Sequence, residues 1–128
     1  MKTDLRTPLA RVRGLGSAKT GTHHFWLQRL TAVSNAVLVV IFIWLVLTLV
    51  GKDHATVQAS LRRPLVALPL LLLILSGTVH MRLGMQTIIE DYVHSEGRKL
   101  IALMLNTFFA VLVGLASAWA VLKLSFGA

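Results

Sequence analysis

The sequence predicts an all-α membrane protein with three transmembrane helices, its N-terminus inside and its C-terminus outside. Two observations carry the fold class: 55% of the 128 residues are hydrophobic, and the mean hydropathy is +0.74. Apolar stretches this long and continuous exceed what the core of an ordinary soluble domain needs. A third observation, the distribution of lysine and arginine, predicts the orientation.

Three apolar runs are long enough to cross a bilayer. Residues 32–50 hold no charged residue, and at the rise of an α-helix they reach about 28 Å, close to the thickness of the hydrocarbon layer. The second run begins at Pro64, where the missing N–H costs least, and continues to about Gln86. The third covers residues 100–122, again without a charge. With their flanks, the expected spans are about 30–51, 62–88 and 97–124.

The segments outside these spans are short and polar. The connection "GKDHATVQAS" (51–60) is expected to be a loop, whereas the Ser-Glu-Gly sequence at 95–97 marks a helix stop and a fresh helix start. Residues 1–28 form a basic arm that precedes a three-helix transmembrane domain, residues 29–128. The arm is arginine-rich like an organellar transit peptide, but it lacks the apolar segment of a secretory signal, and we interpret it as retained.

Positive charges gather before the first span. They are Lys2, Arg6, Arg11, Arg13, Lys19 and Arg29, against Lys52, Arg62 and Arg63 in the first connection and Lys123 near the C-terminus. Because lysine and arginine accumulate on the cytoplasmic side, the arm is expected to be cytoplasmic. The net charge of +8 suits anionic lipid headgroups and partner subunits rather than nucleic acid, since the cations flank apolar runs. The chain has no cysteine and therefore no iron–sulfur cluster of its own.

The second span carries a stripe of polar and small residues. Ser76, Gly77, His80, Gly84, Thr87 and Asp91 recur at steps of three or four, which places them on one helix face. A polar side chain within a span faces other protein or a cofactor, because lipid offers it no partner. His80, with a glycine about one turn to either side, is a candidate ligand of haem iron that leaves room for a flat macrocycle. The alternative is a histidine that hydrogen-bonds a neighbouring helix.

No other histidine of the chain matches the depth of His80. If haem binds, its second axial ligand is therefore expected from a partner subunit. Asp91 follows His80 by eleven residues, so it shares that helix face about 16 Å nearer the inner surface, with Tyr92 beside it. A phenol and a carboxylate at the membrane boundary can hydrogen-bond a quinone and exchange protons as it is reduced. The alternative is structural, since tyrosine is common at membrane interfaces and aspartate commonly caps helices.

The third span has a stripe of its own. It consists of Asn106, Ala110, Gly114 and Ser117. Small residues at this spacing allow two helices to approach closely, and we expect a helix-packing face.

Two motifs carry a resemblance to a known family. The segment "HMRLGMQTIIEDYVH" (80–94) fixes the interval from His80 to Asp91 and Tyr92, and "GSAKTGTHHFWLQRLTAV" (16–33) lies at the inner edge of the first span. Together with the three-helix layout they resemble the smaller hydrophobic membrane anchor subunit of respiratory succinate dehydrogenase, complex II of the cytochrome b type. The resemblance covers nearly the whole chain.

The resemblance implies a role for several residues. His80 matches the family histidine that supplies one axial ligand to haem b, the other coming from the companion cytochrome b anchor subunit. Tyr92 matches the tyrosine that hydrogen-bonds ubiquinone, and Asp91 its neighbour at that site. Arg29 and His23 match residues near the haem propionates. Succinate is oxidised on the flavoprotein subunit, and electrons reach the quinone through the iron–sulfur subunit, so the chain alone is not expected to be catalytic.

The resemblance further implies a multi-pass protein of the bacterial inner membrane, in contact with lipid. Other classes stay open at this point. A haem-free membrane scaffold or a fumarate reductase anchor shares the three-helix layout, and a small transporter subunit accounts for an intramembrane histidine and arginine.

Overall fold

The computed structural model describes residues 7–14 and 21–127, and these residues form helices and connections without a β-strand. In chain order the helices are α1 (Pro8–Val12), α2 (Gly21–Leu49), α3 (His54–Leu61), α4 (Pro64–Tyr92) and α5 (Glu96–Phe126). Helices α2, α4 and α5 are each long and apolar enough to cross a membrane. The predicted all-α fold with three transmembrane helices is therefore confirmed.

The basic arm is only partly described, because residues 1–6 and 15–20 lie outside the described ranges. Within it, α1 is a helical turn that the sequence did not indicate. Helix α2 begins at Gly21, so the expected boundary at residue 28 falls inside a continuous helix. With 29 residues, α2 is about 43 Å long and extends beyond a hydrocarbon layer of about 30 Å.

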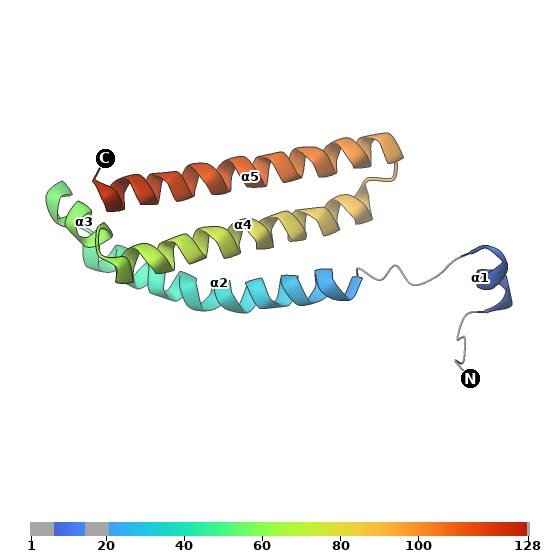
Figure 1. Ribbon diagram of the computed structural model, residues 1–128, viewed down its shortest axis with the longest axis horizontal. Helices are drawn as coiled ribbons and strands as arrows, with labels where there is room; N and C mark the ends of the chain where they lie inside the picture. The colour runs from blue at the N-terminus through green and yellow to red at the C-terminus, as the bar shows by residue number, and fades with distance from the viewer. Residues whose placement is uncertain (1–6, 15–20, 128) are drawn as a thin grey trace.

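Helix α4 is the central element of the molecule. It packs against α2 on one side and against α5 on the other, and the three helices form an open layer rather than a closed bundle (Figure 1). Among the described residues the buried side chains are accordingly few: Thr31, Ala67, Leu83, Ile89 and Ala110. In a membrane such exposure has little cost, because lipid tails are as apolar as the side chains that they cover.

The α4–α5 contact is close. Ala110 is only 1% exposed, and a Cβ added to Gly114 would lie 3.1 Å from the Thr78 side chain. Asn106 donates a hydrogen bond of 2.9 Å from Nδ2 to the backbone carbonyl of Arg82. The stripe that begins at Asn106 is therefore the face on which α5 packs against α4, as predicted.

The expectation of a loop at 51–60 is wrong, because residues 54–61 form α3. Asp53 caps this helix: its carboxylate accepts hydrogen bonds from the Thr56 hydroxyl at 2.6 Å and the Thr56 N–H at 3.2 Å. Gly51, at a φ of 77°, makes the turn out of α2. At its other end α3 is fastened to α5, since the Ser125 hydroxyl donates to the Leu61 carbonyl at 3.0 Å.

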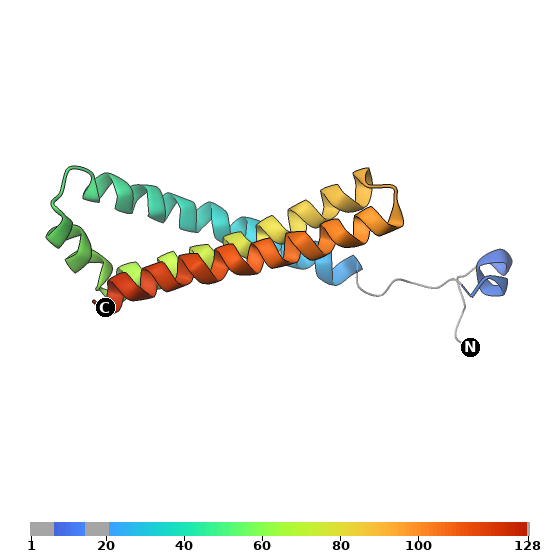
Figure 2. The ribbon, with the colours of Figure 1, turned by 90° about the horizontal axis from the view of Figure 1, so that it is seen from above.

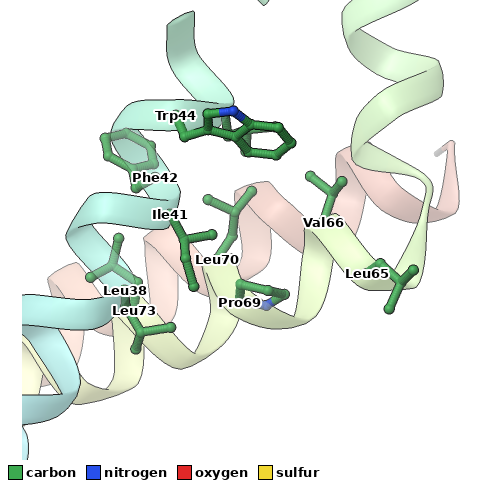
Figure 3. A pocket seen from close by; sticks show the side chains of 10 residues that line it. Leu38, Ile41, Phe42, Trp44, Leu65, Val66, Pro69, Leu70 and Leu73 are labelled. Atoms are coloured by element: carbon green, nitrogen blue, oxygen red, sulfur yellow. The ribbon is translucent and has the colours of Figure 1, made fainter. Parts of the chain in front are cut away.

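Helix α2 crosses α4 near the middle and diverges from it towards both ends (Figure 2). Towards the α3 end, the space between them is a small apolar groove of about 40 Å³ (Figure 3). It is lined by hydrophobic side chains such as Phe42, Trp44 and Leu70, with Pro69 of α4 at its base. The opposite end, where α2 begins and α4 turns into α5, carries the site residues predicted from the sequence.

Candidate functional site

At this opposite end, α2 and α4 diverge again and leave a larger, open pocket with both polar and apolar residues in its lining, which we call the inner pocket. Its volume is about 530 Å³, within the range of small-molecule and cofactor sites. From α2 it is lined by Gly21, His24, Phe25, Gln28, Arg29 and Ala32, and from α4 by His80, Gly84, Thr87 and Ile88. The structure thus brings His80, Gly84 and Arg29 to one opening, although 51 residues separate His80 from Arg29 in sequence.

His80 is half-buried and is held from α2. Its Nδ1 lies 3.1 Å from the Thr31 hydroxyl oxygen, across the interface of the two helices. One turn earlier on α4, the Ser76 hydroxyl donates to the Thr31 backbone carbonyl at 3.4 Å. Because Nδ1 is engaged by Thr31, Nε2 is the ring nitrogen that remains for a ligand.

Gly84 leaves space one turn beyond His80. A Cβ built at this position would meet only the Gln28 side chain, 3.5 Å away, which is an ordinary van der Waals contact. A large side chain at residue 84 would extend into the inner pocket. The clearance predicted beside His80 is therefore present on this side, whereas Gly77 lines a different groove, between α4 and α5.

Arg29 supplies a positive charge at the pocket wall. The carbon of its guanidinium lies 5.2 Å from the centre of the Phe25 ring, a cation–π contact that steadies the side chain. Arg29 remains exposed, so its planar group of donors is available to a carboxylate.

His24 and Gln28 add polar atoms that lack a partner. His24 Nε2 and Gln28 Oε1 are buried without a hydrogen bond to any described residue, and Asn35 Oδ1 further along α2 is in the same state. An unpaired buried polar group costs free energy, so such groups are expected to meet a ligand or a partner subunit.

The remaining site residues predicted from the sequence lie elsewhere. His23 is exposed and does not line the inner pocket. Tyr92 is the last residue of α4 and is 77% exposed, and it lines a second, open pocket with Val93, His94, Arg98 and Ala102. Asp91 is also exposed but lines neither pocket. Arg82, which the sequence does not assign to a site, faces the opposite side of α4, where its Nε donates to the Thr107 hydroxyl at 3.3 Å.

The donor set of the inner pocket suits one kind of metal. In the described ranges, no three His, Cys, Asp or Glu side chains lie close enough together to hold a bare metal ion. Haem iron needs only one or two protein ligands, because the macrocycle supplies the others. A single imidazole, clearance beside it and a cation at the rim fit one side of such a group.

Comparison with known families decides the identity. The profile described as "Succinate dehydrogenase/Fumarate reductase transmembrane subunit" matches residues 3–114. The chain belongs to this family. The resemblance inferred from the two motifs is thereby confirmed, and His80, Arg29 and Tyr92 all lie within the matched range.

Individual relatives of this anchor subunit agree. The succinate dehydrogenase hydrophobic membrane anchor subunit of Paracoccus denitrificans is 33% identical over 122 residues, covering 95% of this chain and 94% of the relative. The same subunit of Rickettsia bellii is 36% identical over 96 residues, 73% of this chain and 74% of the relative. A succinate dehydrogenase membrane anchor subunit of Reclinomonas americana is 32% identical over 96 residues. No solved structure gives a significant match to the chain.

Three residues of the site in the anchor subunit were not predicted from its sequence: His24, Gln28 and Thr31. They follow one another at steps of four and three along α2, so they share one face, which the structure turns towards α4. This periodicity was a usable signal. The signal was obscured because polar residues such as His23 and Arg29 also occur on other faces of this part of α2. Only the packing of α2 against α4 shows which face lines the site.

Proposed function

We propose that this anchor subunit supplies one axial ligand, His80, to a haem b shared with a companion cytochrome b anchor subunit, and forms part of a ubiquinone-reduction site. Electrons arrive from an iron–sulfur subunit, which receives them from a flavoprotein subunit that oxidises succinate. The complex resides in the bacterial inner membrane. The observation that carries the proposal is the inner pocket, in which His80, Gly84 and Arg29 meet.

The role of His80 rests on its available nitrogen. With Nδ1 engaged by Thr31, the neutral ring offers Nε2 to iron, and iron in haem accepts such a nitrogen. When bound, the haem would supply a one-electron carrier within the membrane, near the quinone site that receives electrons from the iron–sulfur subunit. The chain's own contribution is to orient the imidazole and to leave space beside it at Gly84.

The haem propionates are assigned to the rim at Arg29. A guanidinium pairs with a carboxylate in a fork of two hydrogen bonds, and this arrangement is stable at a membrane edge. Two neighbouring histidines are candidates for a further contact with the propionates. The family resemblance favours His23, whereas His24 is favoured by its position in the pocket wall and by its unpaired Nε2. Paired variants separate them: loss of haem in His24→Ala but not in His23→Ala assigns the contact to His24.

The quinone site is assigned to Tyr92 with Asp91, at the inner end of α4. The Tyr92 hydroxyl is exposed and free to donate a hydrogen bond to a quinone carbonyl, and the nearby carboxylate exchanges protons with water. The open pocket that Tyr92 lines has a volume of about 330 Å³. Its open side is where partner subunits would complete the site.

The haem assignment is tested in the assembled complex. The substitution His80→Ala should abolish the Soret absorbance of haem b, whereas His54→Ala, an exposed histidine on α3, should leave it unchanged. An unchanged spectrum in His80→Ala would refute the ligand assignment. A wild-type complex without any Soret band would instead indicate a haem-free scaffold.

The quinone assignment needs a different measurement. Tyr92→Phe removes only the hydroxyl, so quinone reduction should fall while succinate oxidation with an artificial acceptor is spared. Loss of the hydrogen bond to quinone costs on the order of 1 kcal/mol, or about fivefold in turnover. Equal loss of both activities would point to a defect in assembly rather than in the pocket.

A further inference from the structure

We propose that Thr31 is a positioning residue for the haem ligand: its hydroxyl holds His80 in the tautomer that carries the proton on Nδ1 and leaves Nε2 free for iron. The inference rests on the proposed function of His80. It concerns a contact between α2 and α4 that cannot be inferred from either sequence motif alone.

The first step is the proton of the Thr31 hydroxyl. Its oxygen lies 2.8 Å from the Leu27 carbonyl and 3.1 Å from the Gln28 carbonyl, both in the preceding turn of α2. A threonine in a helix commonly donates its one proton to such carbonyls. The hydroxyl then has no second proton to give and can only accept from a further neighbour.

The second step is the ring that faces this oxygen. His80 Nδ1 lies 3.1 Å from Thr31 Oγ1, so it must be the donor of that hydrogen bond. A neutral imidazole carries one proton, and a proton on Nδ1 leaves the lone pair on Nε2. In the other tautomer, the lone pair of Nδ1 would face a lone pair of the Thr31 hydroxyl, which is unfavourable. By taking the hydroxyl proton, the α2 backbone carbonyls therefore favour the tautomer that can bind metal through Nε2.

The contact is also well placed to fix the ring. Thr31 is only 8% exposed and is the buried polar residue of the described helices. It lies at the α2–α4 interface, where the Ser76 hydroxyl reaches the Thr31 carbonyl from α4. Thus α2 presents an acceptor at a fixed position to the half-buried His80 ring.

An oxygen acceptor behind a ligating imidazole makes the ligand more basic, and outer contacts of this kind are commonly worth about 10-fold to 100-fold in metal affinity. A more basic ligand favours the ferric over the ferrous state. Removal of the acceptor should therefore raise the haem reduction potential, and a tenfold change in the ratio of the two affinities corresponds to about 59 mV for one electron.

The experiment uses the purified complex with three variants of the anchor subunit. Thr31→Val keeps the branched shape and loses the acceptor, Thr31→Ser keeps the hydroxyl and loses a methyl group, and Ser76→Ala removes the neighbouring hydrogen bond without touching His80. We expect Thr31→Val to raise the potential in a redox titration of the haem absorbance and to lower haem retention. Thr31→Ser and Ser76→Ala should stay near the wild type.

The order of the two Thr31 variants is decisive. A role in packing alone predicts the reverse, with Thr31→Ser worse than Thr31→Val and no shift of potential in either, and that result would overturn the inference. His80→Ala serves as the reference for the proposed function. If it loses haem while Thr31→Val titrates like the wild type, only the role of Thr31 fails; if it retains the wild-type spectrum, the ligand assignment itself fails.

Discussion

At the scale of single residues, the inner pocket is defined by what surrounds His80. Thr31 engages one ring nitrogen, Gly84 leaves the adjacent turn open, and Arg29 stands at the rim above Phe25. His24 and Gln28 contribute polar atoms that no described residue satisfies. Buried polar groups left without partners are rare in folded proteins, so this wall of α2 is suited to contact something beyond the chain.

The clearance at Gly84 gives a graded prediction. Gly84→Ala adds a Cβ in ordinary contact with Gln28 and should keep its haem, whereas Gly84→Leu extends into the pocket and should lower haem retention about tenfold, the size of a disturbed metal contact. The ratio of haem to flavin in the purified complex measures the effect. Full haem content in Gly84→Leu would show that the macrocycle does not lie beside residue 84.

At the scale of elements, α4 performs two tasks with two faces. Towards α2 it presents His80 and Gly84 to a pocket that stays open at one end, and Ser76 hydrogen-bonds the α2 backbone beside it. Towards α5 it packs closely, with Thr78 against Gly114. The close packing on one side holds α4 in place, so that the residues on the other side keep their positions although little protein covers them.

The α4–α5 contact can be tested by overpacking. Gly114→Val places new atoms against the Thr78 side chain, which lies 3.1 Å from an added Cβ, and should reduce the free energy of unfolding by about 1–3 kcal/mol. Denaturation with SDS in mixed micelles measures it. Thr78→Ala in the same chain should recover part of the loss, and a double mutant no better than Gly114→Val would contradict the proposed contact.

Helix α3 gives a prediction with a pH dependence. The Thr56 hydroxyl, followed by the Thr56 N–H, holds the pKa of Asp53 below its ordinary value of 3.8. Since the pKa is lowered in the folded state, the stabilisation is complete above pH 3.8 and is lost as the pH falls below that value. The protection of α3 amides from hydrogen exchange should therefore weaken in acid.

Two variants separate the cap from the charge. Asp53→Asn keeps a capping oxygen without a titrating group, so its α3 protection should not change across this acid range. Asp53→Ala should lower protection at every pH. Wild-type protection that stays constant from neutral pH to well below the pKa of Asp53 would exclude a contribution from the carboxylate.

At the scale of the whole molecule, the anchor subunit is an open layer of three antiparallel helices with α4 in the middle. The start of α2 and the turn from α4 to α5 lie at one end, and α3 with the end of α5 lies at the other (Figure 1). The inner pocket and the pocket lined by Tyr92 are both at the first of these ends. The positive charges of the arm predict that this end is the cytoplasmic one.

Because the chain has no cysteine, single cysteines can test this orientation. Gly97→Cys, at the turn into α5, should react with a membrane-impermeant maleimide in inside-out vesicles stripped of peripheral subunits. Ala59→Cys on α3 should react only in intact spheroplasts. The opposite pattern would reverse the predicted topology and move the quinone pocket to the outer face.

Much of the fold follows from local physics that can be read along the chain. The apolar runs determine three spans, because backbone polar groups in a membrane must be paired within helices. The placement of His80 and Tyr92 along one helix, and the packing stripe that begins at Asn106, follow from helical periodicity. Helix α3 was missed because its signal, a carboxylate at Asp53 and a hydroxyl at Thr56, is short and lies in a polar segment that also suits a loop.

Other features depend on how two distant helices meet. Which face of α2 turns towards α4, and therefore that Thr31 and His24 rather than His23 lie by His80, is set by the side-chain packing where the helices cross. Hydrophobic periodicity is a weak guide to that rotation here, because α2 is apolar on most of its surface and little of it is buried by the rest of the described chain. The sequence by itself determined the number of membrane-spanning helices and the candidate ligand. Only the tertiary structure decided the pocket around that ligand, since its walls come from helices whose mutual rotation is fixed by contacts between them.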